Sequence, residues 1–176
     1  MVGMQQVFSD ARAQVHAHEL DDTTEIARRC ADFVTTAGPA AALRFLNERT
    51  RFRFTGVYCA EPPLLRNVHL YDRENPALNV SGAVTVLADS YCAIVCAGEP
   101  FLLTDSRADG RIAIRAAREG VRSYCGVPIR LDSGHVWGSL CHFDVRPRFL
   151  PASELALLIR VASCFAPRVT EQAITR

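Results

Sequence analysis

Cysteine is the residue type in this sequence that offers the most chemistry. The chain has seven cysteines, and no two of them have the Cys-x-x-Cys spacing of a structural zinc site. Cys92 follows Asp89-Ser90, a pair that is typical of a helix start, so we expect Cys92 near a helix N-terminus. A helix N-terminus lowers the pKa of a thiol and raises its reactivity. Cys92 is therefore the first candidate for chemistry.

The other reactive residue types exclude several classes of protein. All 20 basic residues are arginine, which excludes Schiff-base formation, pyridoxal phosphate attachment and a phosphate-binding P-loop. The five histidines are dispersed, and their spacing indicates neither a metal site nor a Ser-His-Asp arrangement. Haem ligation by His69 or His142 is a weaker alternative to satisfied or solvent-facing histidines. We therefore predict no metal and no catalytic residue.

Length and composition are typical of one folded domain. The chain has 176 residues, of which 49% are hydrophobic and 22% are charged. The net charge is +1 and no basic run occurs, so we expect no nucleic-acid partner. No apolar stretch approaches the roughly 20 residues that span a bilayer, and the N-terminus lacks a signal pattern. We expect a cytoplasmic protein with no membrane partner and with reduced cysteines.

The clearest structural pattern is a hairpin over residues 122–144. Apolar and small residues flank the turn Asp132-Ser133-Gly134, where the glycine can adopt a positive φ. Both faces of both strands are largely apolar. One face of the second strand is predicted to carry Trp137, Ser139, Cys141 and Phe143, with Val136, Gly138 and Leu140 on the other. A strand that is apolar on both faces is covered on both, so the hairpin is predicted in the middle of the sheet.

The remaining pattern predicts an α+β fold. Helices are predicted weakly over 1–20, then from 21–24 to 38, over 39–50 and 91–97, within 105–120, and from a cap at Ser153. Strands are predicted over 51–60, with Phe52 and Phe54 on one face, over 64–71 and over 101–104. The last helix is predicted to bury Leu155, Leu158, Ile159, Ala162 and Phe165. We divide the chain into a helical extension (1–38) and an antiparallel α+β domain (39–176).

Four motifs together resemble those of a GAF domain. They are Arg53-Phe54-Thr55-Gly56-Val57-Tyr58; Asp89-Ser90-Tyr91-Cys92 with Gly98-Glu99-Pro100-Phe101 and Thr104-Asp105; Tyr124-Cys125-Gly126-Val127-Pro128-Ile129; and Gly138-Ser139-Leu140-Cys141-His142-Phe143-Asp144. In this variant the chain is similar to the GAF modules that accompany bacterial cyclic-di-GMP enzymes and histidine kinases. The resemblance implies a GAF/PAS-like antiparallel sheet of five or six strands, helices on both faces, and frequent dimerisation through the terminal helices.

The same resemblance implies a small-molecule pocket under a roof of mid-chain helices and loops. The residues implied for it are Phe54, Tyr58, Ser90, Tyr91, Cys92, Tyr124, Ser139, Cys141 and Phe143. Aromatic rings with a few hydroxyls and thiols suit a small planar or amphipathic ligand. The alternative is a filled core, in which the tyrosine hydroxyls bond to the backbone. The sequence names neither a ligand nor a cofactor.

Two kinds of chemistry are alternatives to simple binding. Cys92 and Cys141 could meet as a redox pair, although a buried cysteine is more often a small hydrophobic residue. The resemblance also raises free methionine-(R)-sulfoxide reductase, but the loop 105–122 lacks the cysteines of that enzyme. Bilin attachment needs a Cys-His pair on a roof helix, whereas Cys141-His142 lies on a predicted strand, where neighbours point to opposite faces.

We therefore expect a non-enzymatic sensor or regulatory GAF module in bacterial signalling. An unidentified small molecule is its expected ligand. A homodimer formed through the terminal helices is its expected assembly. Ligand contacts would order the roof and bias the packing of the terminal helices, which is a population shift. The alternative is a thiol redox sensor, or an enzyme like the sulfoxide reductase, that uses Cys92 and Cys141.

Overall fold

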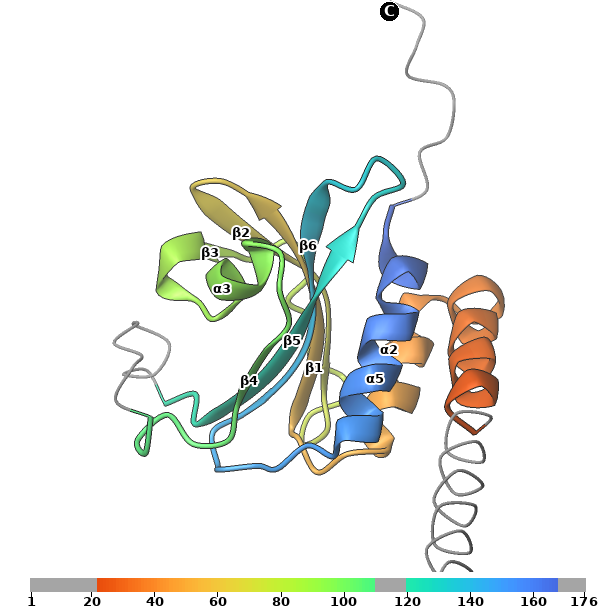
Figure 1. The fold of residues 1–176 in the computed structure, drawn as a ribbon, viewed down its shortest axis with the longest axis horizontal. Coiled ribbons are helices and arrows are strands. Elements are labelled where there is room, and N and C mark those ends of the chain that lie inside the picture. The colour runs from red at the N-terminus through yellow and green to blue at the C-terminus, as the bar shows by residue number, and fades with distance from the viewer. Residues whose placement is uncertain (1–21, 110–119, 168–176) are drawn as a thin grey trace, which may run out of the picture.

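An antiparallel sheet of six strands, in the order β3-β2-β1-β6-β5-β4, forms the centre of the fold (Figure 1). The computed structural model describes residues 22–109 and 120–167. The strands are β1 (Phe54–Glu61), β2 (Leu64–Asp72), β3 (Val84–Val86), β4 (Phe101–Leu103), β5 (Ser123–Arg130) and β6 (Val136–Asp144). The helices are α2 (Pro39–Glu48), α3 (Cys92–Cys96) and α5 (Ala152–Val161), with residues 22–36 also helical and 3₁₀ turns at Leu87–Asp89 and Ala162–Phe165. The predicted α+β class is confirmed.

The hairpin of β5 and β6 forms as predicted. Gly134 in its turn has a φ of +83°, which favours glycine because other residues are strained there. β6 pairs with β5 on one side and with β1 on the other, so it is a central strand buried on both faces. The register shifts after Ile129, and Trp137 packs into the helix-side core rather than on the face of Ser139 as predicted.

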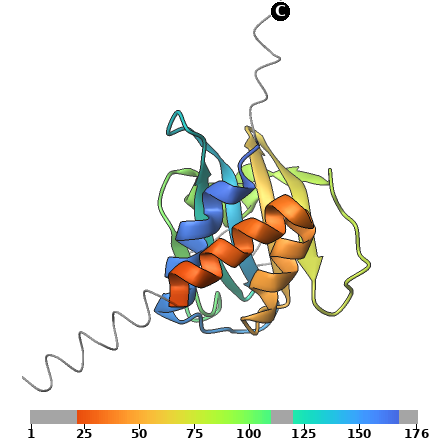
Figure 2. The ribbon, with the colours of Figure 1, turned by 90° about the vertical axis from the view of Figure 1, so that its right-hand side faces the viewer.

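One face of the sheet is covered by two helix layers. α2 and α5 lie against the sheet, and the helix over residues 22–36 lies outside them (Figures 1 and 2). The rings of Phe33 and Phe45 join this outer helix to α2, with centroids 5.1 Å apart. The core of this face includes Leu43, Leu46, Val57, Cys125, Val127, Leu140, Leu157, Leu158 and Val161. Burial of these apolar side chains is the main force that holds the helices to the sheet.

The opposite face is covered by the segment 87–96, which we call the roof. The roof consists of the 3₁₀ turn Leu87–Asp89 and the short helix α3, and it follows directly after the edge strand β3 (Figure 1). A second, smaller core lies beneath it, formed by Leu65, Tyr91, Cys92, Val95, Leu103, Tyr124 and Cys141. The sheet therefore separates a large apolar core from a smaller one that is rich in tyrosine and cysteine.

Two predicted helix caps are wrong. α3 begins after Tyr91, and the Ser90 hydroxyl donates a hydrogen bond back to the Leu87 carbonyl over 2.9 Å instead of capping the helix. α5 begins at Ala152 after Pro151, and no side chain caps it. Backbone carbonyls take the place of the predicted caps: the Ala93 N–H donates to the Ser90 carbonyl, and the Glu154 N–H donates to the Pro151 carbonyl.

Two face assignments are also wrong. Ile159 on α5 is 53% exposed, because Leu157 and Leu158 take the buried side of a helix that is apolar nearly all round. Phe52 precedes β1 and lies on the helix side of the sheet against His142, with ring centroids 5.7 Å apart. Phe52 therefore does not share a face with Phe54, since the period-two alternation begins only where the strand begins.

Some predictions fall outside the described ranges. The helix predicted over 1–20 lies there entirely, and most of the segment 105–120 does as well. Among the helices in residues 22–109 and 120–167, none has the length and apolar character needed to cross a membrane.

Candidate functional site

A cavity of about 120 Å³ lies between the roof and the sheet. Its walls come from the five strands β1, β2, β3, β5 and β6, from the roof, and from Val121 in the loop before β5. The lining residues are Tyr58, Leu65, Thr85, Ser90, Tyr91, Cys92, Val121, Tyr124, Cys141 and Phe143. Seven of these ten are among the nine residues implied by the sequence resemblance. The side chains are mostly aromatic and aliphatic, with two thiols and five hydroxyls among them.

The register of the strands explains which residues meet at the floor of the cavity. Side chains directly opposite one another on paired strands share a face of the sheet. Phe54, Phe143 and Tyr124 form one row across β1, β6 and β5. Gly56, Cys141 and Gly126 form the next row, and Asn67, Tyr58 and Ser139 form a row across β2, β1 and β6. Cys141 therefore lies between two glycines.

Because Gly56 and Gly126 have no β-carbon, they leave room for the rings of Tyr58 and Tyr124. A β-carbon on Gly126 would stand 2.7 Å from ring atoms of Tyr124, and one on Gly56 would stand 2.8 Å from Cε2 of Tyr58. Contacts this short do not occur between carbon atoms, so any larger residue would displace the rings. Each tyrosine lies over the glycine two residues away on its own strand. The rings of Tyr58 and Tyr124 thus flank Cys141 from its two sides.

Aromatic stacking extends this floor toward the roof. Tyr91 of the roof lies 5.3 Å from Tyr124 and 6.1 Å from Phe101, measured between ring centroids. Phe54 and Phe143 stack at 4.7 Å. These separations are typical of favourable aromatic pairs. The rings of Tyr91, Phe101 and Tyr124 thus support the roof above the sheet.

The Cys92 thiol is the most acidic of the described cysteines. The pKa of Cys92 is lowered to about 7, chiefly by a hydrogen bond from the Cys141 thiol, and further by the Tyr124 hydroxyl. The Tyr124 oxygen lies 3.4 Å from the Cys92 sulfur. Burial and the neighbouring Cys92 sulfur instead raise the pKa of Cys141 well above its usual range. Cys92 is therefore the thiol of this pair that ionises first, while Cys141 keeps its proton.

Three polar side chains near the cavity are buried with no hydrogen-bond partner among residues 22–109 and 120–167. They are Asn67, through both its amide nitrogen and its amide oxygen, the hydroxyl of Tyr91, and the hydroxyl of Ser139. Asn67 faces Tyr58, and Ser139 lies toward the Cys92 sulfur, but neither reaches hydrogen-bonding geometry. Buried polar groups are nearly always bonded, and an unpaired one costs about 1–3 kcal/mol. Tyr91 is part of the cavity lining, and Asn67 and Ser139 lie in the row of Tyr58 beside it.

Two residues implied by the resemblance do not line the cavity. Phe54 lies one stacking distance behind Phe143, and Ser139 lies buried beside Tyr58. Three lining residues were not anticipated, namely Leu65, Thr85 and Val121. The alternation of apolar residues along β2 could have identified Leu65. Thr85 and Val121 lie in a three-residue edge strand and in a loop, which carry no period from which a face can be read.

The remaining cysteines show no comparable environment. Burial raises the pKa values of Cys30, Cys96 and Cys125 to about 12, and the side chains of Cys30 and Cys125 belong to the helix-side core. All seven cysteines are free thiols. Within the described ranges, no group of three or more histidine, cysteine or acidic side chains is placed to hold a metal ion.

Comparison with known proteins identifies the family to which this architecture belongs. The family profile of the GAF domain matches residues 22–166, which includes part of the stretch that the sequence pattern assigns to a helical extension. A comparison with proteins of curated function gives no significant match.

Several solved structures share the fold at low sequence identity. The GAF domain of a phosphoenolpyruvate-protein phosphotransferase from Acinetobacter is 13% identical, with a TM-score of 0.64 over 80% of this chain and 88% of that one. A putative GAF sensor protein from Burkholderia vietnamiensis is 15% identical, with a TM-score of 0.63 over 84% and 92%. The free methionine-R-sulfoxide reductase from Neisseria meningitidis, solved with its substrate, is 17% identical, with a TM-score of 0.63 over 81% and 84%.

Proposed function

Because the chain belongs to the GAF domain family, we propose that it is a non-enzymatic regulatory module that binds a small molecule between the roof and the sheet. The observation that carries this proposal is the cavity itself, which aromatic rings and hydroxyls line, with the unpartnered Tyr91 hydroxyl in its lining and the unpartnered Asn67 and Ser139 in the row of Tyr58 beside it. A ligand that bonds to them would recover the free energy that they lose in the empty cavity. The rest of the lining would hold an apolar body by stacking and exclusion of water.

The volume of the cavity limits the size of this ligand. A dry engineered cavity of about 150 Å³ accommodates benzene, whereas sites for drug-sized ligands span roughly 300–1,000 Å³. At about 120 Å³ the cavity suits a planar molecule of about one ring with one or two polar groups. A larger ligand would need the roof to move. The proposed ligand class is therefore a small, neutral or weakly polar ring compound.

A buried polar chain offers a route from the cavity to the helices. β6 carries Cys141 on the cavity side and His142 on the helix side. His142 Nδ1 lies 2.7 Å from the Thr55 hydroxyl, which accepts a hydrogen bond from Asn47 Nδ2 of α2 over 2.8 Å. Since Thr55 already accepts from Asn47, its proton points to His142, whose Nδ1 is the acceptor. A displacement of β6 by a ligand would therefore be felt at the end of α2.

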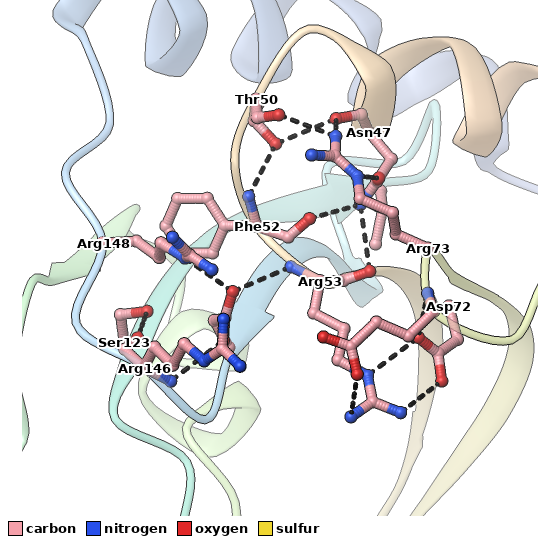
Figure 3. Close-up of polar contacts among 12 residues, drawn as sticks. Asn47, Thr50, Phe52, Arg53, Asp72, Arg73, Ser123, Arg146 and Arg148 are labelled. Atoms are coloured by element: carbon pink, nitrogen blue, oxygen red, sulfur yellow. Dashed lines mark hydrogen bonds and ion pairs between the residues drawn. The ribbon is translucent and has the colours of Figure 1, made fainter.

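Arginine side chains hold the α2 end of this row of hydrogen bonds in place. Arg73 donates to Asn47 Oδ1 over 3.0 Å and also to the backbone carbonyls of Asn47 and Thr50, which close α2 (Figure 3). Asp144 at the end of β6 accepts from the Arg53 backbone N–H over 3.0 Å and from Arg148 Nε over 2.7 Å. The ends of β1, β2, β6 and α2 are thus tied together, which supports transmission as a rigid shift rather than as local relaxation.

The signalling role implies a partner for the outer helices. We propose a second copy of this chain, packed through its terminal helices, and Ile159 on α5 is the exposed apolar residue that supports such a contact. The free, hydrogen-bonded thiols of Cys92 and Cys141 suit a reducing compartment, so we propose a cytoplasmic location. Sedimentation of the protein and of Ile159→Glu tests the dimer, since the variant should be monomeric.

The likeness to the Neisseria meningitidis reductase supports a shared fold, and we do not extend the activity in its title to this chain. Among the described residues that line the cavity, none carries a carboxylate. Turnover of free methionine-R-sulfoxide by the purified protein would contradict the non-enzymatic proposal.

Thermal unfolding with phenol as the probe tests the binding proposal. Phenol adds one hydroxyl to a ring of benzene size, and a ligand at 100 times its Kd stabilises the folded state by about 2.7 kcal/mol. Thr85→Phe should fill the cavity from β3 and abolish the phenol-dependent rise in Tm. Val84→Phe is the matched control, because Val84 is its exposed neighbour outside the cavity lining. An equal rise in both variants, or none in the wild type at millimolar phenol, contradicts the proposal.

A further inference from the structure

The roof and the floor of the cavity each contribute one cysteine to a single contact. Cys92 is the first residue of α3, and Cys141 lies in the middle of β6. Both thiols line the cavity and belong to the same small core, and the Cys141 thiol is the main cause of the lowered pKa of Cys92. No disulfide is needed to hold this part of the fold, because the aromatic rings already support the roof. A pair of free thiols joining a movable segment to a fixed one has a use beyond packing.

We propose that Cys92 and Cys141 form a reversible dithiol–disulfide switch, oxidised by a small peroxide, that fastens α3 to β6 and closes the cavity. The switch acts on the cavity proposed above, so its effect on binding rests on that proposed function. Formation of the disulfide does not, since it depends only on the two thiols. The two proposals can therefore fail separately.

The environment assigns a different role to each sulfur. Cys92 has the lower thiol pKa and receives the Tyr124 hydrogen bond, so it is the nucleophile. Its thiolate attacks one peroxide oxygen, the O–O bond breaks, and the leaving oxygen takes up a proton to leave as water or an alcohol. Cys92 is then a sulfenic acid.

The second step uses the Cys141 sulfur. Cys141 loses its proton and attacks the Cys92 sulfur, and the sulfenic hydroxyl leaves with that proton as water. With hydrogen peroxide, two thiols and one peroxide give one disulfide and two waters, so two electrons pass from the sulfurs to the peroxide oxygens. A small dithiol reductant reverses the reaction by thiol–disulfide exchange.

The cavity determines which oxidant can reach the pair. Cys92 is 4% exposed and Cys141 is fully buried, so a bulky disulfide such as oxidised glutathione cannot approach either sulfur. Hydrogen peroxide has two heavy atoms and fits a cavity of about 120 Å³. Ring compounds in the cavity would occupy the same space, so a bound ligand should protect the thiols from peroxide.

Oxidation changes the cavity itself. A disulfide places the two sulfurs about 2 Å apart, much closer than the contact distance of two thiols. The roof is thereby drawn onto β6, the thiolate is lost, and the Tyr124 hydroxyl loses its acceptor. We expect the oxidised protein to bind phenol at least tenfold more weakly than the reduced protein.

Peptide mapping after mild peroxide treatment of the full-length protein is the first test. The expected product is a Cys92–Cys141 cross-link that dithiothreitol removes. Cys92→Ser should abolish it, whereas Cys96→Ser should retain it, because Cys96 lies on the same helix but has a raised thiol pKa. Over-oxidation of Cys92 without a cross-link, or earlier oxidation of the half-buried Cys59 or Cys164, overturns the proposal.

Two further measurements test the switch even if Cys92→Ser does not fold. They also distinguish failure of the switch from failure of the binding proposal. Oxidised glutathione should not produce the cross-link in the wild type, which needs no variant, and cross-linking at an equal rate would overturn the access argument. Phenol binding before and after oxidation then tests regulation. A cross-link with unchanged phenol binding overturns the closing of the cavity while leaving the binding proposal standing.

Discussion

The Tyr124 hydroxyl donates a hydrogen bond to the Cys92 sulfur over 3.4 Å, and this bond joins the floor of the cavity to its roof. Tyr124 is held by the rigid β5 and Cys92 by a five-residue helix. The bond therefore fixes the less rigid element to the more rigid one, and it also stabilises the charged form of the thiol.

Tyr124→Phe should raise the pKa of the Cys92 thiol, because the thiolate loses a donor while the ring remains in place. The rate of Cys92 alkylation by iodoacetamide, measured against pH, should shift to higher pH. We also expect a loss of about 1 kcal/mol in the free energy of unfolding. Tyr91→Phe is the control, since its hydroxyl has no hydrogen-bond partner, and it should leave the alkylation profile unchanged. A shift of equal size in both variants would contradict this account of the thiol.

Gly126→Ala should destabilise the protein by about 1–3 kcal/mol, because the new β-carbon meets the Tyr124 ring. Urea unfolding measures the change. In a Tyr124→Val background the same substitution should cost much less, since the obstacle is gone, and the cycle of four proteins isolates the contact. Additive costs would show that the glycine serves some other purpose.

His142 should make the protein sensitive to mild acid. Burial, and then the positive charge of Arg73, lowers the pKa of folded His142 to about 3, whereas the unfolded chain protonates near 6.5. The unfolded state therefore binds the extra proton first, and stability falls as the pH drops from about 6.5 toward 3, by up to about 1.4 kcal/mol per pH unit.

His142→Asn should remove this slope while keeping an acceptor for the Thr55 hydroxyl. The slope is measured from unfolding free energies between pH 6.5 and 4.5. Aspartates with lowered pKa values, such as Asp72, affect stability only below this range. His135→Asn, in the exposed turn, is the control and should retain the slope. Persistence of the full slope in His142→Asn would assign the acid response to another group.

The ion pair between Arg53 and Asp72 should contribute more to the stability of the fold than the exposed ion pair between Glu61 and Arg66. Arg53 contacts both carboxylate oxygens of Asp72 at 2.8 Å, and the Asp72 side chain is 2% exposed (Figure 3). Asp72→Asn should lower the urea midpoint clearly, since Arg53 loses its buried partner and keeps only the exposed Glu74. Glu61→Gln breaks the exposed pair with Arg66, and its midpoint should not move measurably.

The fold was predictable where the pattern is local and regular. The Asp132-Ser133-Gly134 turn and the doubly apolar strands around it determine the hairpin, and its central position followed from burial on both faces. Seven lining residues were predicted through the GAF resemblance, because its motifs place them on known strand faces. The period of a strand alone identifies neither the roof nor the side on which a pocket opens.

The errors arose where several local solutions have similar free energies. Ser153 is a good cap, but the helix begins at Ala152 with Pro151 in the N-cap position, two residues earlier than predicted. α5 is apolar nearly all round, so periodicity could not choose between Ile159 and Leu157 for the core. Thr85 reaches the cavity because β3 pairs with β2. This pairing joins separate segments of the chain, and a strand of three residues is too short for its sequence to predict it.

Gly56 and Gly126 have a consequence for redesign of this protein. Beneath each tyrosine ring there is only main chain, so shortening Tyr58 or Tyr124 to alanine would open a chamber with bare peptide groups as its base. Because the amides of β1 and β5 already pair with neighbouring strands, this base would be flat and would admit larger, mainly apolar guests. The breadth of what this scaffold accepts is therefore adjustable through two side chains, with no change to its backbone.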